Sequence, residues 1–532
     1  MKNPGGQPLK LSQGWIIALI GIPIFIGALD LTVVSAVLPH VIYDLELPIQ
    51  TQLDKAAWIV TGYLMAYSIA MAVMGHLSDL FGRRKVFLIA LIIFTLGSLM
   101  VAVSDTWLTK AGLRVWYLFS NERADVPSFS LYLIIGSRII QAIGGGAMVP
   151  VGMALIGDIY PIGKRSQALG IIAAIDTAGW VVGHLYGGIV VYYFDWRLIF
   201  WLNIPICALA FGLIFWVLRG VKLETASKKM DWVGVFLVSA FLTLLIFGIG
   251  GGGNADVSIS LDSQDKTVIW WALIAAAFCL LAAILWERKA KHPLFDPALF
   301  RIRNLLAGGL ANLLIGCAMF IAIANVPIFI NAVSTGTLER SAWDSGWLLS
   351  ALTIPIAFAA IPGGWLTEKL RYKIPALLGL IIASAGFFWM NHWAVDSTYR
   401  EMIPQLILTG VGLGLTFSPI ASAALDAAPP LQRGTVSAVV LTMRLIGMTI
   451  GVSSMTIYDI NRANSLIREL IATDSSMYDM VRLSQEILVR VIDETFLIAA
   501  VLCLLSCVIV LLLSNRIHNL GETSHEQLHL QQ

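Results

Sequence analysis

Four ionisable residues stand inside long apolar runs of this chain, namely Asp30, Arg138, Asp176 and Arg444. A charged side chain in the core of a lipid bilayer is costly, and such residues generally carry a function. A carboxyl group in a cavity of low dielectric constant can exchange a proton, because burial opposes its charge while a nearby cation favours it. The two aspartates therefore indicate proton uptake and release inside a membrane. Helix clamping is the alternative for all four residues.

Asp30 is the residue that we expect to bind the proton. It lies about nine residues from the outer end of the predicted span 15–39, which is roughly 13 Å of helix. Arg138 lies about seven residues, or roughly 10 Å, from the outer end of the predicted span 131–155. These similar depths predict that both side chains face one aqueous cavity. The other two ionisable residues lie nearer the inner side, and their depths do not establish a contact.

The composition places these residues in a polytopic membrane protein. Of the 532 residues, 58% are apolar and only 13% are charged, about half the charged fraction of a soluble domain. The net charge of +2 favours no polyanionic partner, and we expect no nucleic acid to bind. The five cysteines all stand in apolar runs, where helix packing is their expected role. No grouping of side chains indicates a metal site or an enzyme.

Fourteen apolar runs are long enough to cross a bilayer as helices. They lie near residues 15–39, 56–77, 86–104, 131–155, 167–191, 199–218, 233–250, 267–286, 305–331, 345–365, 376–394, 402–421, 434–456 and 495–514. With the N-terminus inside, the inner segments carry 21 lysines and arginines and the outer segments carry 12. Cytoplasmic loops are enriched in these cations. The sequence therefore predicts an all-α protein of fourteen transmembrane helices in the plasma membrane, with both termini cytoplasmic.

A short charged segment joins the second and third predicted spans. It holds two glycines that permit close helix approach and a tight turn, one carboxylate and two arginines: Gly75, Gly82, Asp79, Arg83 and Arg84. A similar segment follows the tenth span, where Glu368 again lies four residues after a glycine. This repeat predicts two six-helix bundles, residues 1–218 and 305–532, with two inserted spans in residues 219–304. Secondary transporters are built from such repeats, with substrate sites between them.

Two outer segments are unusually long. Residues 105–130 are rich in aromatic side chains, and we expect a short amphipathic segment on the outer surface, either functional or without a function of its own. Residues 457–494 are acidic and have helical spacing of apolar residues, which predicts an extracellular helix. That helix could cover a transport pathway as a lid.

Several distinct motifs lie in the spans and the segments that join them. The first span contains Leu29-Asp30-x-Thr32-Val33-Val34, and the fourth contains Arg138-x-x-Gln141. The fifth span contains Gly179, Gly183, His184, Gly187 and Gly188, and Asp195-Trp196-Arg197 and Asn203-Ile204-Pro205 follow it. Together with the charged segment at 75–85, these motifs resemble those of the fourteen-helix drug:proton antiporters of the major facilitator superfamily. Two positions depart from the family pattern, which usually has proline in place of His184 and glycine in place of Ala142.

The resemblance implies roles for the motif residues. Asp30 would be the proton or cation site in the central cavity, and Arg138 would belong to the proton-relay helix. Thr32 and Gln141 would lie with them among the residues of proton coupling and the substrate cavity. Asp79 and Arg83 would latch the two halves on the inner side. The glycines of the fifth span would keep that helix closely packed. His184 would be either an added titrating group or a polar packing residue.

The predicted function is proton-coupled export of amphipathic, cationic small molecules by alternating access, which is multidrug efflux. Tyr63, Met65 and Tyr67 of the second span could line the cavity or simply pack between helices. Export of an endogenous lipid, siderophore or metabolite is the alternative, and a scaffold or receptor that transports nothing is a more distant one. We expect a monomer that uses the proton gradient without a cofactor and has the substrate, protons and the lipid bilayer as its partners.

Overall fold

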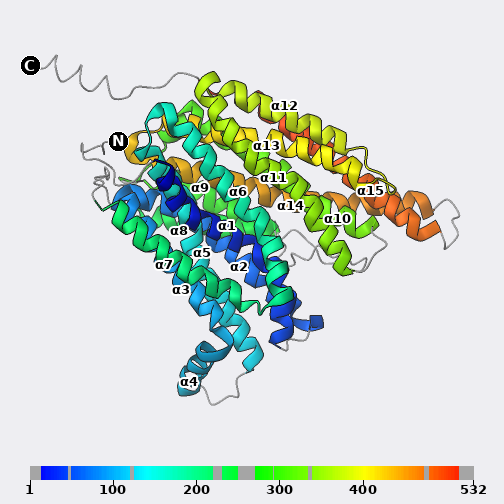
Figure 1. Ribbon diagram of the computed structural model, residues 1–532, viewed down its shortest axis with the longest axis horizontal. Helices are drawn as coiled ribbons and strands as arrows, with labels where there is room; N and C mark the ends of the chain where they lie inside the picture. The colour runs from blue at the N-terminus through cyan, green and yellow to red at the C-terminus, as the bar shows by residue number, and fades with distance from the viewer. Residues whose placement is uncertain are drawn as a thin grey trace, which may run out of the picture.

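The computed structural model describes residues 13–45, 49–119, 125–219, 230–249, 270–291, 293–333, 338–471 and 479–514, and its regular structure there is helical. Each apolar run forms a long helix because a helix satisfies the backbone hydrogen bonds of its own segment, as a bilayer requires. The helices lie side by side in an elongated bundle (Figure 1). The end of the bundle at which α1 begins and α15 ends is called the termini side below.

The first half of the bundle contains six long helices. They are α1 (Gln13–Asp44), α2 (Ile49–Phe81), α3 (Arg83–Ala102), α5 (Val126–Ile159), α6 (Ile162–Tyr193) and α7 (Arg197–Val217). In this half α1 packs along α6, both α2 and α3 pack on α5, and α7 packs on α3. These contacts bring α1, α3, α5 and α7 together around the residues that the sequence singled out.

The second half repeats this arrangement. Its helices are α10 (Arg303–Val333), α11 (Leu338–Leu370), α12 (Lys373–Met390), α13 (Tyr399–Ala427), α14 (Arg433–Ile471) and α15 (Asp479–Val510). Here α10 packs along α14, both α11 and α12 pack on α13, and α15 packs on α12. The halves meet where α2 lies against α14 and α6 lies against α11. This pairing is what the internal sequence repeat predicts, while the boundaries of the domains stay a prediction.

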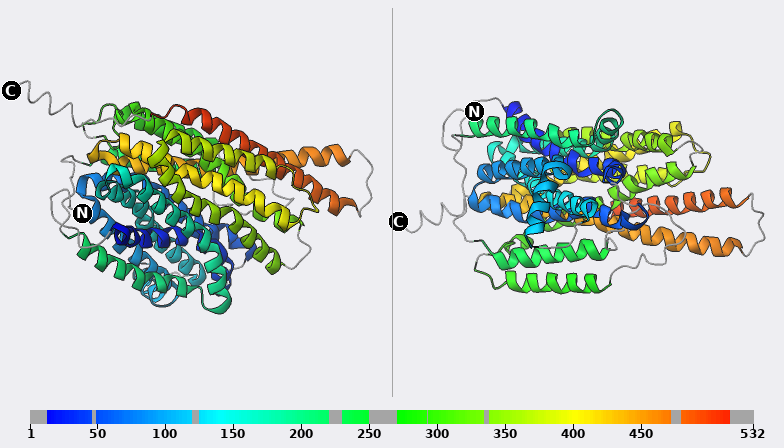
Figure 2. Two further views of the ribbon diagram at one scale, coloured as in Figure 1. Left: turned by 45° about the horizontal axis from the view of Figure 1, so that its top comes forward. Right: turned by 90° about the horizontal axis from the view of Figure 1, so that it is seen from below.

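Two further helices, α8 (Trp232–Ile249) and α9 (Trp270–Glu287), form a hairpin beside the bundle. The right view of Figure 2 shows this green pair below the rest, and α8 packs next to α2 and α14. At its base the indole nitrogen of Trp286 donates to both carboxylate oxygens of Asp231, at 3.1 and 2.9 Å. The hairpin therefore lies outside the contact between the halves and is held together mainly by its own two helices.

Close packing in the first half depends on glycines of α5. A Cβ atom on Gly144 would overlap the backbone of α3 at Phe94, and one on Gly146 would overlap the backbone of α2 at Tyr67. Small residues let helix backbones approach, which is how helices associate in lipid. The glycine run of the fourth predicted span is thus a packing surface between three helices.

Twelve segments within the described part of the chain are long and apolar enough to cross a membrane. The sequence predicted fourteen spans, and the two without this support correspond to α6 and α8. In both helices the stretch with described side chains is shorter than a full span, and in α8 it is Trp232–Gly248. The protein is an all-α polytopic membrane protein, and twelve helices in its described part qualify as membrane spans by their length and composition.

Both segments that the sequence predicted to be long outer loops contain helical residues. The segment 105–130, predicted as a short amphipathic segment, begins within the π-helix η1 (Ser104–Leu108) and continues as the helix α4 (Thr109–Phe119), while its placement on the outer surface stays a prediction. The segment 457–494 contains no separate helix within its described part, because α14 continues through to Ile471 and α15 begins at Asp479. These two extended helices project beyond the remaining bundle at the end opposite the termini (Figure 2).

Candidate functional site

Asp30 and Arg138 form a buried ion pair between α1 and α5. Nη1 of Arg138 donates to Oδ2 of Asp30, and Nη2 donates to the Asp30 carbonyl oxygen at 3.1 Å. Both side chains are fully buried, with exposures of 1% for Arg138 and 0% for Asp30. The guanidinium also lies over the Tyr63 ring, 3.9 Å from its centroid. The shared location predicted from their depths is therefore a direct contact.

The ion pair belongs to a closed ring of five side chains from four helices. Nη1 of Arg138 also donates to Oε1 of Gln141 at 2.6 Å, and Nε2 of Gln141 donates to Oγ of Ser98 at 2.6 Å. The Asn203 amide donates to Oγ of Ser98 at 3.2 Å and to Oδ1 of Asp30 at 3.4 Å, which completes the ring. A buried charge is tolerated when each partner is paired and hydrogen-bonded, as here.

Sequence reasoning identified three members of this ring and missed two. Asn203 was noted only as part of a motif, and Ser98 was not singled out. Both are polar residues inside otherwise apolar runs, and both are buried. Their position opposite Asp30 depends on the packing of α7 on α3, which the sequence does not reveal.

Two glycines of the antiporter motif, Gly179 and Gly183, lie on the face of α6 that packs against α1. A Cβ atom on Gly179 would meet the Phe25 carbonyl oxygen at 2.5 Å, and one on Gly183 would overlap the Thr32 hydroxyl. The Thr32 hydroxyl lies 3.0 Å from the Trp180 carbonyl oxygen of α6, to which it can donate. Thr32 is therefore a contact between α1 and α6 and is absent from the ring around Asp30.

The remaining motif positions have different surroundings. Gly187 is buried, whereas Gly188 is exposed and a Cβ atom there would meet nothing within 4 Å. The side chain of His184 lies outside the described residues. The close approach of α6 to α1 therefore rests on Gly179 and Gly183.

Asp176 of α6 lies close enough to Arg444 of α14 for their charges to attract one another across the two halves. The Arg444 guanidinium lies over the Phe417 ring, 4.2 Å from its centroid. Oδ1 of Asp176 and Nε of Arg444 are both shielded from solvent and have no hydrogen-bond partner in the described part of the chain. Tyr67 stacks on Tyr63, with 5.9 Å between the ring centroids, and lies within electrostatic reach of both Asp176 and Arg444. This second charged group thus adjoins the aromatic residues next to the Asp30 ring.

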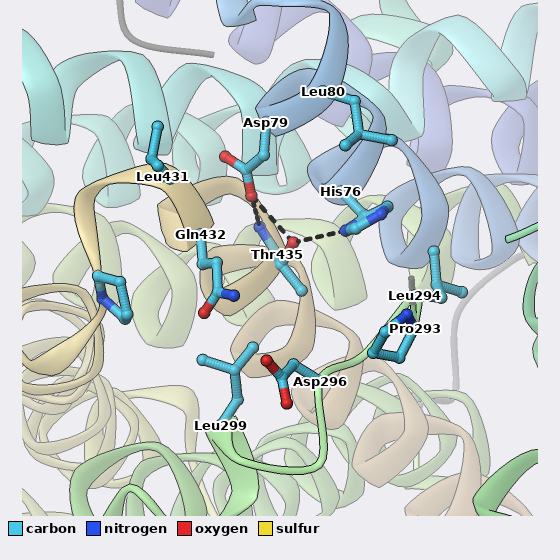
Figure 3. A pocket seen from close by; sticks show the side chains of 11 residues that line it. His76, Asp79, Leu80, Pro293, Leu294, Asp296, Leu299, Leu431, Gln432 and Thr435 are labelled. Atoms are coloured by element: carbon cyan, nitrogen blue, oxygen red, sulfur yellow. Dashed lines mark hydrogen bonds between the residues drawn. The ribbon is translucent and has the colours of Figure 1, made fainter. Parts of the chain in front are cut away.

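Asp79 connects the halves on the termini side. Its carboxylate accepts hydrogen bonds from the backbone nitrogens of Gly434 and Thr435 at 2.9 and 2.8 Å, and from the Thr435 hydroxyl at 2.9 Å. A carboxylate is stabilised at a helix N-terminus, where backbone N–H groups lack partners. Figure 3 shows Asp79 and His76 converging on Thr435 at the start of α14.

Arg83 extends this contact. Its guanidinium pairs with Asp79 at 3.0 Å and with Asp158 of α5, and it donates to the Pro430 carbonyl oxygen of the second half at 2.7 Å. Asp158 in turn binds Arg433 at 3.1 Å. Gly82, with φ of 95°, makes the turn that brings Arg83 back toward Asp79. Arg84 instead donates to the Phe215 carbonyl oxygen of α7 at 3.0 Å.

A corresponding contact joins α11 to α6. Oε1 of Glu368 accepts from the backbone nitrogen of Gln167 at 3.1 Å, and Arg165 pairs with Asp426 across the halves. The Tyr372 hydroxyl donates to the same Asp426 carboxylate at 2.8 Å. Burial and the Asp426 charge raise the pKa of Tyr372, so it remains a donor at neutral pH. The termini side is thus closed by two similar sets of contacts.

A cavity of about 150 Å³ lies beside this closure. Its lining combines α2 and the start of α14 with the linker that follows α9 (Figure 3). The linker contributes Pro293, Leu294, Asp296 and Leu299. The linker therefore packs next to the Asp79 contact at the termini end of the bundle.

Comparisons with known proteins agree with this architecture. The family profile described as Major Facilitator Superfamily matches residues 20–452. A triacylglyceride transporter of Mycolicibacterium smegmatis is 30% identical over 97% of this chain and 89% of its own length. A triacylglyceride transporter of Mycobacterium tuberculosis is 30% identical over 96% of this chain and 95% of its own length.

Solved structures show the same fold. The human organic anion transporter MFSD10 superposes with a TM-score of 0.59 at 12% identity, covering 94% of this chain and all of that one. A proton:xylose symporter, XylE, superposes with a TM-score of 0.58 at 13% identity, covering 93% of this chain and 94% of that one. At such identities these structures establish the fold alone.

The repeated helical halves and the charged residues buried between helices define a polytopic membrane transporter rather than an enzyme. The chain belongs to the major facilitator superfamily and is a secondary transporter of that superfamily. The sequence motifs suggested a likeness to multidrug antiporters within this superfamily, and that likeness stays a prediction. The two relatives matched over nearly their full length are instead named for triacylglycerides.

Proposed function

We propose that this protein exports an amphipathic, lipid-like molecule and couples the export to proton entry at Asp30. The observation that carries the lipid proposal is the near full-length similarity to relatives named triacylglyceride transporters. The multidrug prediction becomes the second candidate, because the alternative of an endogenous lipid fits these relatives better. The proton proposal rests on the ring around Asp30, whose carboxylate is completely buried and bonded to Arg138.

Protonation of Asp30 would change the ring in a defined way. A neutral carboxyl group loses most of its attraction for the Arg138 guanidinium, and its new hydroxyl group must find an acceptor. The contact between α1 and α5 weakens as a result. Because α1 packs on Gly179 and Gly183 of α6, and α6 packs on α11 of the other half, a shift of α1 reaches the interface between the halves.

Alternating access would then open the termini side, which is closed here, and close the opposite side. Asp79 and Arg165 hold the termini side shut in this conformation. We place this side in the cytoplasm of a plasma-membrane protein, because cationic residues gather there. We also assign α6 and α8 as membrane spans, which brings the total to fourteen. In this arrangement, opening of the cytoplasmic side requires the Asp79 and Arg165 contacts to break.

Efflux of cationic amphipathic compounds has one observation in its favour. Oδ1 of Asp176 is buried without a hydrogen-bond partner in the described residues, and Tyr67 lies within its electrostatic reach. A carboxylate beside aromatic rings suits an organic cation. Arg444 opposes this, because it already supplies a positive charge to Asp176.

Transport in proteoliposomes tests both candidates. An imposed proton gradient is combined with a fluorescent triacylglyceride analogue or with a lipophilic cationic dye, and wild type is compared with Asp30→Asn. Asp44→Asn is the matched control, because this aspartate also lies on α1 but pairs with Arg197 at the solvent-exposed end. We expect gradient-driven movement of the triacylglyceride analogue that Asp30→Asn abolishes and Asp44→Asn retains.

Each other result has a clear meaning. Movement of the dye alone would favour the cationic-compound candidate. Equal movement in wild type and Asp30→Asn would remove Asp30 from the coupling mechanism. Movement of neither probe by correctly folded wild-type protein would contradict both substrate proposals.

A further inference from the structure

The helix α4 carries an exposed face that the transport cycle described above does not use. It stands at the edge of the first half, at the end opposite the termini (Figure 1). One face of α4 is fixed to α5: the Thr109 hydroxyl lies 3.0 Å from that of Ser130, and the Trp116 and Phe129 rings lie 6.3 Å apart. Gly112 permits this approach, since a Cβ atom there would lie 2.8 Å from the Phe129 ring.

The opposite face of α4 points away from the protein. Leu118 is 78% exposed, Val115 is 55% exposed, and Lys110 and Arg114 are exposed as well. At 100° per residue, Val115 and Leu118 form an apolar strip, and Lys110 and Arg114 form a cationic strip along its side. Trp107 of the preceding π-helix η1 is 69% exposed. The two chemistries are thus segregated on a single exposed surface.

This surface continues a lipid-facing stripe of α3. Exposed apolar side chains recur along that helix at a spacing of three and four residues, namely Ile89, Ile92, Leu96 and Leu99. In a membrane protein such a stripe faces acyl chains. The chain then passes through η1 into α4, so the exposed face of α4 lies where the hydrocarbon stripe ends and the polar boundary of the bilayer begins.

We propose that α4 binds the phospholipid surface at the end of the bundle opposite the termini. Val115, Leu118 and Trp107 would enter the boundary of the acyl chains, as apolar and aromatic residues of interfacial helices do. Lys110 and Arg114 would contact lipid phosphates, and their long side chains can reach toward the headgroups. The complementary charge of an anionic phosphate favours a lipid surface over water or an apolar protein partner.

Through its fixed face, α4 would connect this lipid contact to the helices of the Asp30 ring. α4 and η1 both pack on α5, which carries Arg138 and Gln141, and η1 follows α3, which carries Ser98. Lipid binding at α4 would therefore hold the outer ends of these two helices at a fixed depth. The proposal does not depend on which molecule the protein transports.

Spin-label accessibility of the reconstituted full-length protein tests the membrane contact. A label is placed through Leu118→Cys in a variant whose five native cysteines are replaced, and Arg482→Cys on α15, 71% exposed, is the control. Vesicles are made of phosphatidylcholine with phosphatidylglycerol. We expect collisions with oxygen to exceed collisions with a nickel chelate at 118, and the reverse at 482. More frequent nickel collisions at 118, or protection from both probes, would overturn the proposal.

A charge reversal tests the phosphate contact. Lys110→Glu combined with Arg114→Glu is expected to lower the ratio of oxygen to nickel collisions at 118 severalfold in phosphatidylglycerol vesicles, and less in phosphatidylcholine alone. An unchanged ratio in both vesicles would overturn the role of the two cations. The same charge reversal is also made in the Arg482→Cys protein, where an unchanged mobility of the label at 482 confirms that the variant remains folded.

Discussion

Asp30 has different partners at its two carboxylate oxygens. Oδ2 accepts from Arg138, and Oδ1 accepts from the Asn203 amide at 3.4 Å. Asn203 is neutral, so it can remain beside Asp30 whether the carboxyl group is charged or protonated, whereas the ion pair with Arg138 depends on the charge. We therefore regard Asn203 as a positioning residue that keeps Asp30 between α1 and α7.

The first prediction concerns this positioning role. Asn203→Ala is expected to reduce proton-driven transport by about tenfold or more, which corresponds to roughly 1.4 kcal/mol. The physical reason is that Asp30 and Ser98 both lose the amide that closes the ring. Substrate movement in proteoliposomes under an imposed proton gradient provides the measurement.

Asn312→Ala is the control for this variant. Asn312 is also a buried amide in a helix and donates to the Val440 carbonyl oxygen at 3.0 Å, but it lies in the other half. Each alanine variant is expected to lose about 1–3 kcal/mol of stability by leaving polar groups unpaired. If both variants lose transport equally, the effect of Asn203 is structural and the positioning role is wrong.

Among the helices, α14 links three functional regions. Its first residues, Gly434 and Thr435, receive Asp79 at the termini side. Arg444 lies further along the helix, within reach of the Asp176 charge, and Asp459 lies further still toward the C-terminal end of α14, which projects beyond the bundle (Figure 2). A helix of 39 residues moves largely as one body, so closure at its start affects the position of its far end.

The second prediction concerns the contact of α14 with α2. Gly75→Ala places a methyl group where the Gly434 carbonyl oxygen lies, which should disfavour the closed termini side by about 1–3 kcal/mol. Distances between spin labels at Lys85→Cys and Lys369→Cys, one in each half, are expected to increase. Gly136→Ala is the matched control, because a Cβ atom there would meet nothing within 4 Å. Unchanged distances in Gly75→Ala would contradict a closure that depends on this approach.

The third prediction concerns pH and the projecting part of α14. Burial raises the pKa of Asp459 from 3.8 to about 7, and its Oδ1 has no hydrogen-bond partner in the described residues. Between about pH 4 and 7 the folded segment binds more protons than the unfolded one, so its stability falls as the pH rises. Asp459→Asn should remove this dependence and stabilise the segment by roughly 2–4 kcal/mol at pH 8.

Amide hydrogen exchange over residues 455–471 measures this effect at pH 5 and pH 8. Wild-type protein should exchange more readily at pH 8, after correction for the intrinsic pH dependence of exchange, and Asp459→Asn should show little difference. Glu486→Gln is the control, because this carboxylate is 53% exposed on α15. A wild-type segment that is equally protected at both pH values would show that Asp459 is not held in a destabilised charged form.

At the scale of the whole molecule, two halves with the same internal pairing are joined at one end. Asp79 reaches the start of α14, and Glu368 reaches the start of α6. Ser418 of α13 adds a bond to the Ser166 carbonyl oxygen at 2.7 Å. Because these contacts gather on the termini side, breaking them allows the halves to separate there without unfolding either one.

The fourth prediction tests this closure by exchanging charges. Arg165→Asp or Asp426→Arg alone puts like charges together across the halves and should reduce transport by at least about tenfold, or 1.4 kcal/mol. The double variant restores opposite charges, and a substantial recovery of transport is expected. The same exchange at the exposed pair of Arg482 and Glu486 should have little effect, since surface ion pairs contribute about 0–1 kcal/mol. No recovery in the double variant would argue against a direct role of the Arg165 pair in closure.

The sequence by itself determined the class of this protein and the places where its chemistry resides. Long apolar runs make membrane-spanning helices, because each helix pairs its own backbone groups. Asp30 and Arg138 stood out because charges inside such runs are rare and costly. The glycines and cations around Asp79 likewise indicated a tight turn on the cationic side, and the family resemblance of this segment implied a contact between the halves there. These inferences are local, and they need no knowledge of which helices are neighbours.

The tertiary structure alone decided which side chains meet. Ser98, Asn203 and Asp30 are separated by long stretches of sequence, and only the packing of α3 and α7 beside α1 brings them into one ring. The contact of Asp79 with α14 spans more than 350 residues in the same way. A side chain's depth follows from its position in its own helix, but its partner depends on the rotation and order of helices, which arise from packing over the whole bundle.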